Sequence, residues 1–473
     1  MRRLFNFSFL IISICSGQLI SIKSVPLAAG SQFSIYPSES FGMGNISIAF
    51  NDTYKDPYNN PVTGRNIHKS IIFCLPTFYT QSEQKYFNKS FPLSLLLRRN
   101  SWFAGFCLAL QQVNNQPLNN RDSWQIIPET LSGHSGRNQY LHLFAGKEIR
   151  KNTTNLAWSF LMSELNAVDG IDYLYSNSAR VELHGNIYDY RVGLSHCIES
   201  LHTFELLLLH HRSNITHKVI YPSWLDWSMD NAIENKDRTN TWGGHLKYLY
   251  PINKNYWQLG CIVTINYKTH PKIPNYDLMN IPRDPGNSYA YNFGIGIAKS
   301  IDSLKFGIDM IYEPIWSHTW AVATNNLHTN SDKIINPGEK TVNNDFQFNN
   351  VHLRTGLYSQ GRVIGIQLGL AVSSINYRLR QNDFVLERKR KAEENWFEWN
   401  FTWGLVLKLS GFDLYYQGQV LYGLGIPGIE MQNRLMYAGE DFKSDLVVAP
   451  AGDLTLQDTA ILTHRIMIAV PIE

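Results

Sequence analysis

The chain has 473 residues and a formal net charge of +3, too small an excess to indicate a nucleic-acid partner. Charged residues make up 17% of the sequence and aromatic residues 13%, whereas an ordinary globular protein carries roughly 25% charged residues. This balance is typical of a wall that faces lipid. No run of about 18 uncharged apolar residues follows the amino terminus, which argues against a transmembrane helix. A membrane form of this chain would therefore be a closed barrel.

The amino terminus has the pattern of an export signal. Arg2 and Arg3 precede an apolar run over residues 4–14, and Cys15-Ser16-Gly17 supplies small residues at its end. We therefore predict a signal peptide over residues 1–17 and export of the remaining chain.

Residues 18–66 differ from the rest, because glycines and prolines interrupt them and only a short stretch alternates. This segment contains a motif formed by Gly42, Met43, Gly44, Asn45, Asp52, Tyr58, Asn60 and Pro61. The motif resembles the amino-terminal signature of FadL-type outer-membrane barrels. Thr53 replaces the second aspartate of that signature, and Val62-Thr63 replaces its usual alanine-glycine.

The resemblance implies a hatch over residues 18–66, inside a barrel formed by residues 67–473. It implies a bacterial outer-membrane channel for passive uptake or export of small hydrophobic molecules similar to long-chain fatty acids. Such a channel needs no catalytic residue, metal or cofactor. Barrels with a related signature include shuttle proteins of the type IX secretion system, so exported proteins remain an alternative cargo.

The clearest strand pattern lies between residues 397 and 424. Phe397, Trp399 and the following odd positions are apolar, while the even positions are mostly polar, and the pattern resumes after a turn at Ser410-Gly411. Each strand is about a dozen residues long, which suits a tilted crossing of a bilayer. We expect Glu398, Lys408, Asp413 and Gln417 to line the lumen, and Trp396, Phe397 and Trp399 to lie at the outer rim.

The connections between predicted strands alternate between short and long, which is typical of outer-membrane barrels. The short ones include 360–361 and 410–411, and the long ones 315–345, 379–395 and 425–458. We therefore predict an all-β, transmembrane, antiparallel up-and-down barrel with about 14 strands, within a range of about 12 to 16. A weak strand candidate lies near 122–130.

Two patterns suggest chemistry but lack its context. Gly133-His134-Ser135-Gly136 is similar to a nucleophile elbow, yet Arg137 replaces the last glycine and no strand-to-helix turn is predicted. His210 and His211 are adjacent, so on a strand they point to opposite faces and cannot easily share a metal. An outer-membrane hydrolase, with a triad assembled only by the fold, stays a further alternative.

A basic run lies in the predicted loop over 379–395. Its cations suit the phosphates of lipopolysaccharide, although a solvated loop would have the same composition. We therefore expect membrane lipids and lipopolysaccharide as partners, besides a small hydrophobic ligand. The run consists of Arg388, Lys389, Arg390 and Lys391.

Overall fold

The structure is a computed structural model of the chain. It describes residues 19–20, 32–82, 84–115, 134–151, 153–167, 180–198, 202–220, 232–253, 257–270, 286–301, 303–323, 325–424 and 459–472. The predicted signal peptide, the strand candidate near 122–130 and the loop over 425–458 lie outside these ranges. Within them, no helix has the length and apolar character needed to cross a membrane.

Three short helices precede the strands: η1 (Phe41–Met43), α1 (Asp56–Asn59) and η2 (Pro61–Asn66). The strands follow in the order β1 (Ser70–Cys74), β2 (Thr77–Gln81), β3 (Gln84–Arg99), β4 (Trp102–Asn115), β5 (His134–Arg150), β6 (Thr154–Leu165), β7 (Arg180–Ile198), β8 (His202–Ile220), β9 (Ala232–Asn253), β10 (Trp257–His270), β11 (Gly286–Ile301), β12 (Leu304–Val322), β13 (Leu327–His328), β14 (Ile334–Ile335), β15 (Lys340–Gln360), β16 (Ile364–Asp383), β17 (Arg388–Lys408), β18 (Asp413–Leu424) and β19 (Thr459–Ile472).

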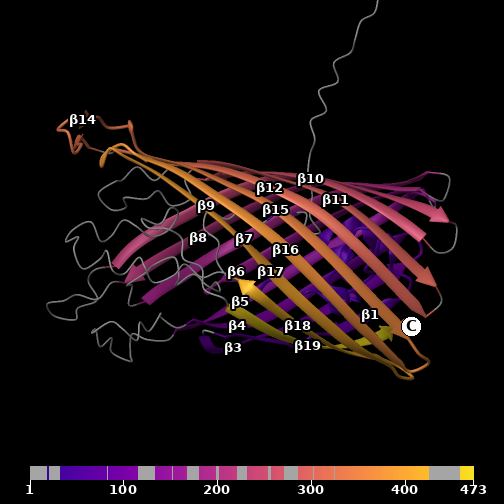
Figure 1. The fold of residues 1–473 in the computed structure, drawn as a ribbon. Coiled ribbons are helices and arrows are strands. Elements are labelled where there is room, and N and C mark those ends of the chain that lie inside the picture. The colour runs from indigo at the N-terminus through magenta and orange to yellow at the C-terminus, as the bar shows by residue number, and fades with distance from the viewer. Residues whose placement is uncertain are drawn as a thin grey trace, which may run out of the picture.

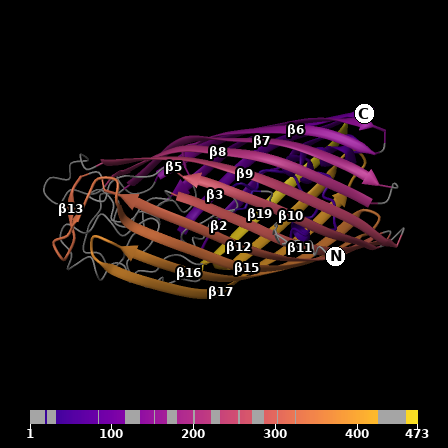
Figure 2. The ribbon, with the colours of Figure 1, turned by 90° about the horizontal axis from the view of Figure 1, so that it is seen from above.

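All strands except β13 and β14 form one closed antiparallel sheet. β19 closes it by pairing with β1 and β2, and the strands wrap obliquely around a common axis (Figures 1 and 2). The sheet has 17 strands, but β1 and β2 share one position between β19 and β3, so the barrel has 16 positions. The all-β barrel is confirmed, and its 16 positions lie at the upper limit of the predicted range, above the expected number of about 14.

The sequence-based count missed β3, because its residues hide the alternation. Pro92 lies in the middle of the strand, and three leucines follow one another at 95–97. In the structure, Pro92 lies opposite the break between β1 and β2, where the Leu75 N–H donates to its carbonyl at 3.0 Å. Proline has no backbone N–H, and an N–H at residue 92 would point toward this same break, where the neighbouring ladder is already interrupted. Few ladder hydrogen bonds are therefore lost.

The β17–β18 hairpin has the two faces that the sequence predicts. Phe397, Trp399 and Phe401 are exposed on the outer face, while Thr402 and Val406 are buried on the inner face. Glu398, Lys408, Asp413 and Gln417 share the inner face, in agreement with the prediction.

Trp396 corrects one detail of that prediction. It has the same parity as Glu398, and its Nε1 donates to the Glu398 Oε1 at 3.1 Å. Its ring therefore belongs to the inner face of β17 and not to the outer rim, since side chains two apart on a strand point the same way.

The two ends of the barrel differ in their connections. At the end that holds the carboxyl terminus, β15 and β16 are joined by 361–363, and β17 and β18 by 409–412. At the other end, which we call the loop end, two of the predicted loops are wrong. Only 384–387 separate β16 from β17, and 323–339 separate β12 from β15. Polar residues beyond the lipid continue the ladder, and hydrophobic alternation cannot reveal such extensions.

An apolar belt covers the outer face of the wall. Its exposed residues would face water in a soluble protein, whereas a closed barrel with an apolar exterior satisfies its backbone internally and presents hydrocarbon to lipid. We therefore treat the barrel as membrane-spanning. Members of the belt include Leu108, Leu208, Ile295, Met310, Leu353, Ile366 and Leu368.

Residues 32–67, which we call the luminal segment, lie inside the barrel (Figure 1). Its helix η1 contacts β15, β16, β17 and β18, whereas η2 contacts β4, β5, β6 and β7. Because these two groups of strands are far apart in the order of the sheet, the segment spans the lumen between them.

Candidate functional site

The glycines of the amino-terminal motif let the luminal segment approach the wall closely. Gly44 has a positive φ of 69°, and its N–H donates to the Thr402 Oγ1 at 2.8 Å. Gly356 and Gly369 are cross-strand partners on the inner face of β15 and β16. A Cβ on Gly369 would lie 2.0 Å from the Gly44 nitrogen, and one on Gly356 would lie 2.2 Å from the Met43 carbonyl oxygen. Backbone packs on backbone here, which only glycine allows.

Asp52 folds the luminal segment on itself. Its carboxylate accepts hydrogen bonds from the Ser38 Oγ at 2.6 Å and from the Ser40 N–H at 2.9 Å. It also accepts from the Tyr54 and Lys55 N–H groups at 3.2 and 3.0 Å. The residue is 1% exposed, so no water could replace its carboxylate as the acceptor of these hydrogen bonds.

Asp309 and Lys247 hold the segment to the opposite wall. The Asp309 Oδ2 accepts from the Ser47 and Ile48 N–H groups at 2.7 and 3.1 Å. The Lys247 Nζ donates to the Ser47 carbonyl at 3.1 Å. The Asp309 carboxylate and the Lys247 ammonium thus satisfy hydrogen-bonding groups of a backbone turn that pairs with no strand.

Further wall side chains bind carbonyls of the segment in the same way. The Gln367 Nε2 donates to the Glu39 carbonyl at 2.7 Å, and the Gln417 Nε2 donates to the Ser38 carbonyl at 2.9 Å. The Arg191 Nη1 donates to the Asn59 carbonyl at 2.6 Å. Each of these bonds joins one side chain to the segment, so breaking it leaves the strand ladder intact.

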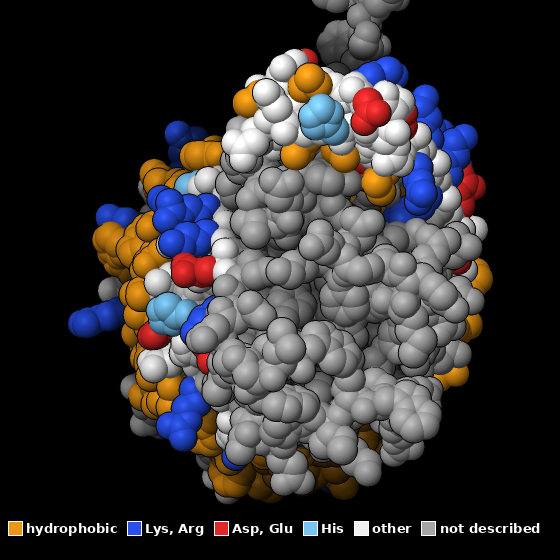
Figure 3. Space-filling model, turned by 90° about the vertical axis from the view of Figure 1, so that its left-hand side faces the viewer, with side chains coloured by type: hydrophobic (Ala, Val, Ile, Leu, Met, Phe, Trp, Pro, Cys, Tyr) orange, Lys and Arg blue, Asp and Glu red, His pale blue; other side chains and the backbone are white. Residues whose placement is uncertain are grey.

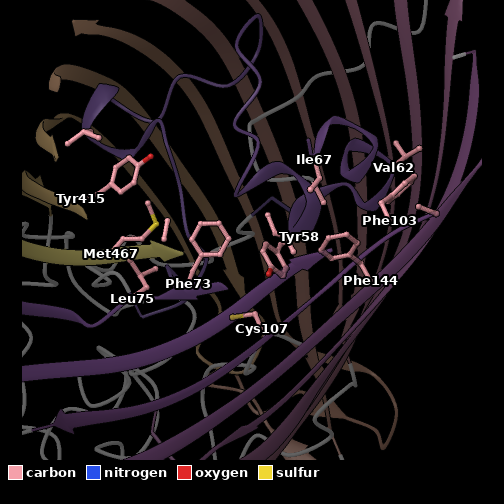
Figure 4. Close-up of a cluster of buried hydrophobic side chains, with 14 residues drawn as sticks. Tyr58, Val62, Ile67, Phe73, Leu75, Phe103, Cys107, Phe144, Tyr415 and Met467 are labelled. Carbon is pink, nitrogen blue, oxygen red and sulfur yellow. The ribbon is translucent and has the colours of Figure 1, made fainter. Parts of the chain in front are cut away.

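The second half of the segment packs through apolar and aromatic side chains. Tyr58 stacks on Tyr36 with ring centroids 4.9 Å apart, meets Phe144 edge-on at 5.3 Å, and donates its hydroxyl to the Phe106 carbonyl at 2.9 Å. Figure 4 shows this buried cluster between the segment and the wall. Its members include Tyr58, Val62, Ile67, Phe73, Leu75, Phe103, Cys107, Phe144, Tyr415 and Met467.

Two carboxyl groups of the segment lie in surroundings that favour their neutral form. Burial, reinforced by the charge of Asp52, raises the pKa of Glu39 to about 7. Burial and Asp52 likewise raise the pKa of Asp56 to about 7, against the opposing effect of Lys247. Both groups change charge in the neutral pH range while the segment is packed in the lumen.

All residues of the predicted hatch motif lie in the luminal segment and contact the barrel or fold the segment. Besides the roles of Gly44, Asp52 and Tyr58, the Asn60 Nδ2 donates to the Glu205 Oε2 at 3.1 Å. Gly42, Met43, Asn45 and Pro61 complete the set, with Gly42 and Met43 in η1 and Pro61 at the start of η2.

The patterns that suggested other chemistry lie in ordinary strand contexts. His134-Ser135-Gly136 begins β5, without a strand-to-helix turn. The His211 Nδ1 lies 3.2 Å from the Asp189 Oδ2, whereas His210 stacks on Trp242 at 4.0 Å, so the two rings do point to opposite faces. No metal-binding cluster of His, Cys, Asp or Glu occurs among the described residues. The cysteines that the structure describes, Cys74, Cys107, Cys197 and Cys261, are free thiols.

The basic run from Arg388 to Lys391 was predicted to lie in the loop over 379–395. This prediction is wrong, because the run forms the start of β17. Alternation therefore divides it. Lys389 and Lys391 share the outer face with Phe397, while Arg388 and Arg390 share the inner face. The four cations cannot act as one patch.

The sequence analysis did not identify Lys247 and Asp309 as partners of the segment. It also missed the role of the inner-face glycines. A signal for them exists, because glycines recur at inward positions of neighbouring strands, and each would clash with the segment if it had a Cβ. These are Gly260, Gly294, Gly296, Gly307, Gly356 and Gly369, whose closest contacts include Met43, Ile46 and Ile48.

A cavity of about 530 Å³ lies beside the break between β1 and β2. Pro76, Phe78 and Phe91 contribute to its lining, together with Ser90 and Gln111, which belong to the inner parity of the wall. Most of the lining belongs to β3, β4 and β5, whose ladder is continuous at this place.

No family model and no curated protein sequence matches the chain. Similar solved structures include a FadL homologue from Pseudomonas aeruginosa, with 8% identity, coverage of 94% of this chain and 100% of that one, and a TM-score of 0.45. The CymD monoaromatic hydrocarbon channel has 8% identity, coverage of 96% and 99%, and a TM-score of 0.43. CdiB from Acinetobacter baumannii has 8% identity and a TM-score of 0.42, and the match covers 85% of this chain but only 60% of CdiB. Each likeness is distant in sequence and partial in shape.

Proposed function

We propose that this protein is a bacterial outer-membrane channel for passive movement of small hydrophobic molecules, with the luminal segment as its hatch. The closed wall and its apolar exterior support a membrane position. A passive channel of this kind needs neither a nucleophile nor a cofactor. It needs a closed state and an open state that are close in free energy.

The observation that carries the proposal is how the segment is held in the lumen. Single side chains such as Asp309, Gln367 and Gln417 bind its backbone, and it adds no strand to the sheet. Such contacts can be exchanged for water without opening the wall, since each net hydrogen bond contributes only about 1 kcal/mol. A segment held in this way can leave its position while the barrel stays closed to the lipid.

The apolar cluster supports a hydrophobic cargo. Aromatic rings of Phe73, Phe103 and Phe144 lie on the lumen side of the wall beneath the second half of the segment, a surface that release of that half would uncover. Burial of apolar ligand area there would supply binding energy of about 25 cal/mol per Å².

A disulfide that joins the segment to the wall tests this proposal. An ideal Cβ on Gly356 lies 2.7 Å from the Met43 Cβ, so a small outward shift reaches the about 3.8 Å of a disulfide. We expect proteoliposomes with the native chain to take up labelled fatty acid. Oxidised Met43→Cys/Gly356→Cys protein should lose uptake, and a reductant should restore it.

The single variants Met43→Cys and Gly356→Cys, treated with the same oxidant, are the matched controls. They also account for the native thiols, which all three variants share. Gly356→Cys alone crowds Met43 and should raise uptake if it changes it, so a loss of uptake identifies the disulfide. Absence of uptake by the native protein, or equal uptake before and after cross-linking, would contradict the hatch mechanism.

A second candidate is a barrel that binds exported proteins. The long strands β15, β16 and β17 end at the same side as the β13–β14 hairpin, and together they form a projection at the loop end (Figure 1). Such a projection could receive a cargo protein. Stable co-purification with exported proteins, combined with no fatty-acid uptake, would favour this function over the channel.

A further inference from the structure

A groove on the outer wall near the loop end has the chemistry of a phosphate site at a membrane surface. Its volume is about 370 Å³. It lies across β11, β12, β15 and β16, on the face that carries the apolar belt. Its principal lining residues are Tyr289, Trp316, His318, Asp345, Arg378 and Arg380.

The strand register places aromatic rings and cations of this groove in adjacent rows. Tyr289 pairs with Trp316 on neighbouring strands, and Arg378 lies in the same row two strands further on. Tyr289 and Trp316 are 44% and 42% exposed on the outer face, as expected for rings at a membrane–water interface. Arg378 therefore lies at the same level of the wall as these two aromatic rings, at the expected membrane–water interface.

The next row toward the loop end brings two cations together without a protein anion between them. Arg380 and Lys391 are direct cross-strand partners, and both are exposed. Like charges in this position repel each other. Neither side chain forms a hydrogen bond or ion pair with any residue that the structure describes.

The neighbouring acids already have partners. Asp345 is the other cross-strand partner of Arg380, and its Oδ1 lies 2.6 Å from the His318 Nδ1. The Glu393 Oε1 lies 2.7 Å from the Nε of Arg378 itself. Arg378 keeps its remaining guanidinium donors for another acceptor, because a guanidinium has five N–H groups. Lys389 lies one row further toward the loop end on the same outer face. Figure 3 shows lysine and arginine side chains gathered beside hydrophobic ones along this end of the wall.

We propose that Arg378, Arg380 and Lys391 bind a phosphate of a lipopolysaccharide molecule in the outer leaflet. The cations supply charge-assisted hydrogen bonds to phosphate oxygens, and the rings of Tyr289 and Trp316 pack against the lipid below them. The position of the groove on the lipid face identifies a lipid as the occupant, since a free ion would gain nothing from the apolar floor. This site replaces the linear run from Arg388 to Lys391 as the lipid contact.

Retention of lipopolysaccharide by the full-length barrel tests the site. The protein is placed in nanodiscs that contain neutral phospholipid and a rough lipopolysaccharide, then washed in detergent, and bound lipid is counted by native mass spectrometry. We expect Arg380→Gln/Lys391→Gln to reduce retention by about tenfold or more. Lipopolysaccharide stripped of its phosphates should be retained equally poorly by the native protein and by the variant.

The matched control is Lys218→Gln/Lys236→Gln, which removes the same charge from two exposed lysines that pair with Glu182 and Glu234. This variant should retain lipopolysaccharide as the native protein does. Heat-modifiable gel migration checks that every variant keeps the barrel.

Equal retention by the native protein and by Arg380→Gln/Lys391→Gln would overturn the proposal. Undiminished retention of the phosphate-free lipid would do so as well. Displacement of the lipid by inorganic phosphate at matched phosphate concentration would show that the groove selects a free anion, which also contradicts a lipid site.

Discussion

The two halves of the luminal segment contact the wall through the same kinds of group in different proportions. Residues 42–51 meet the wall through glycine contacts, through bonds from Asp309 and Lys247, and through small apolar clusters that include Ile46 and Ile48. Residues 54–67 meet β1, β3, β4 and β5 through a larger apolar cluster that includes Tyr58, besides polar contacts with the wall. Hydrogen bonds can be exchanged with water, whereas a packed apolar surface must be exposed to be released. Because the larger apolar cluster belongs to the second half, we infer that the first half releases more readily and that the second half is the anchor.

The largest effect should follow from removing the anchor. Tyr58→Ala deletes a fully buried aromatic ring, for which we expect a loss of about 4 kcal/mol. Because the ring packs on wall residues such as Phe144, the temperature at which heat-modifiable migration changes should fall. Tyr58→Phe keeps the ring and loses only the bond to the Phe106 carbonyl, at a cost of about 1 kcal/mol. An equal fall in both variants would mean that packing of the ring is not what anchors this half.

Removing the carboxylate on the polar side should release the segment without unfolding the wall. Asp309→Ala leaves the Ser47 and Ile48 N–H groups without their acceptor, a loss of about 3 kcal/mol. We expect faster hydrogen exchange at these two amides and increased fatty-acid uptake, with an unchanged barrel transition. Asp309→Asn keeps an oxygen acceptor and should be intermediate. A lowered barrel transition in Asp309→Ala would remove the distinction between the two halves.

Adding one methyl group to the inner wall should also displace the polar half. Gly369→Ala places a Cβ 2.0 Å from the Gly44 nitrogen, and relief of such overpacking costs about 2 kcal/mol. Uptake should therefore rise. Gly244→Ala is the control, because the nearest atom to its added Cβ is a leucine methyl at 4.0 Å. Similar uptake by the two variants would contradict the inference that close contacts at glycines hold the segment against the wall.

The smallest effect should be a dependence on pH. The packed state raises the pKa of Glu39 and Asp56 to about 7, so it binds protons that the released state gives up at lower pH. Packing is therefore favoured at acidic pH and weakened as the pH rises from about 5 to about 8. Uptake should increase over this range, and Glu39→Gln/Asp56→Asn should reduce the slope. A decrease of uptake with rising pH would refute this sign.

Much of the wall could be predicted from its sequence. The alternation from Phe397 onward identifies both faces of the β17–β18 hairpin, since lipid on one side and a polar lumen on the other impose period two. The amino-terminal motif also identified Gly44, Asp52 and Tyr58 as a group of special residues. Alternation fails where a strand does not have lipid on one face and a polar lumen on the other. The extension of β16 to Asp383 lies beyond the lipid, so its outer residues are not hydrophobic. In β3 the inward Leu96 packs on the luminal segment, so an inner residue is hydrophobic.

The all-β class follows from the sequence alone, because strand periodicity is a local property. The luminal segment was expected through the resemblance of its motif. Only the tertiary structure decided the number of positions in the barrel, since closure depends on which strands pair. It also decided the partners, bringing Asp309 to Ser47 and Ile48 from more than 250 residues away in the chain. The register of β16 and β17 likewise brings Lys391 to Arg380 at the edge of the groove. A linear basic run could not reveal it, because adjacent strand residues point to opposite faces of the wall.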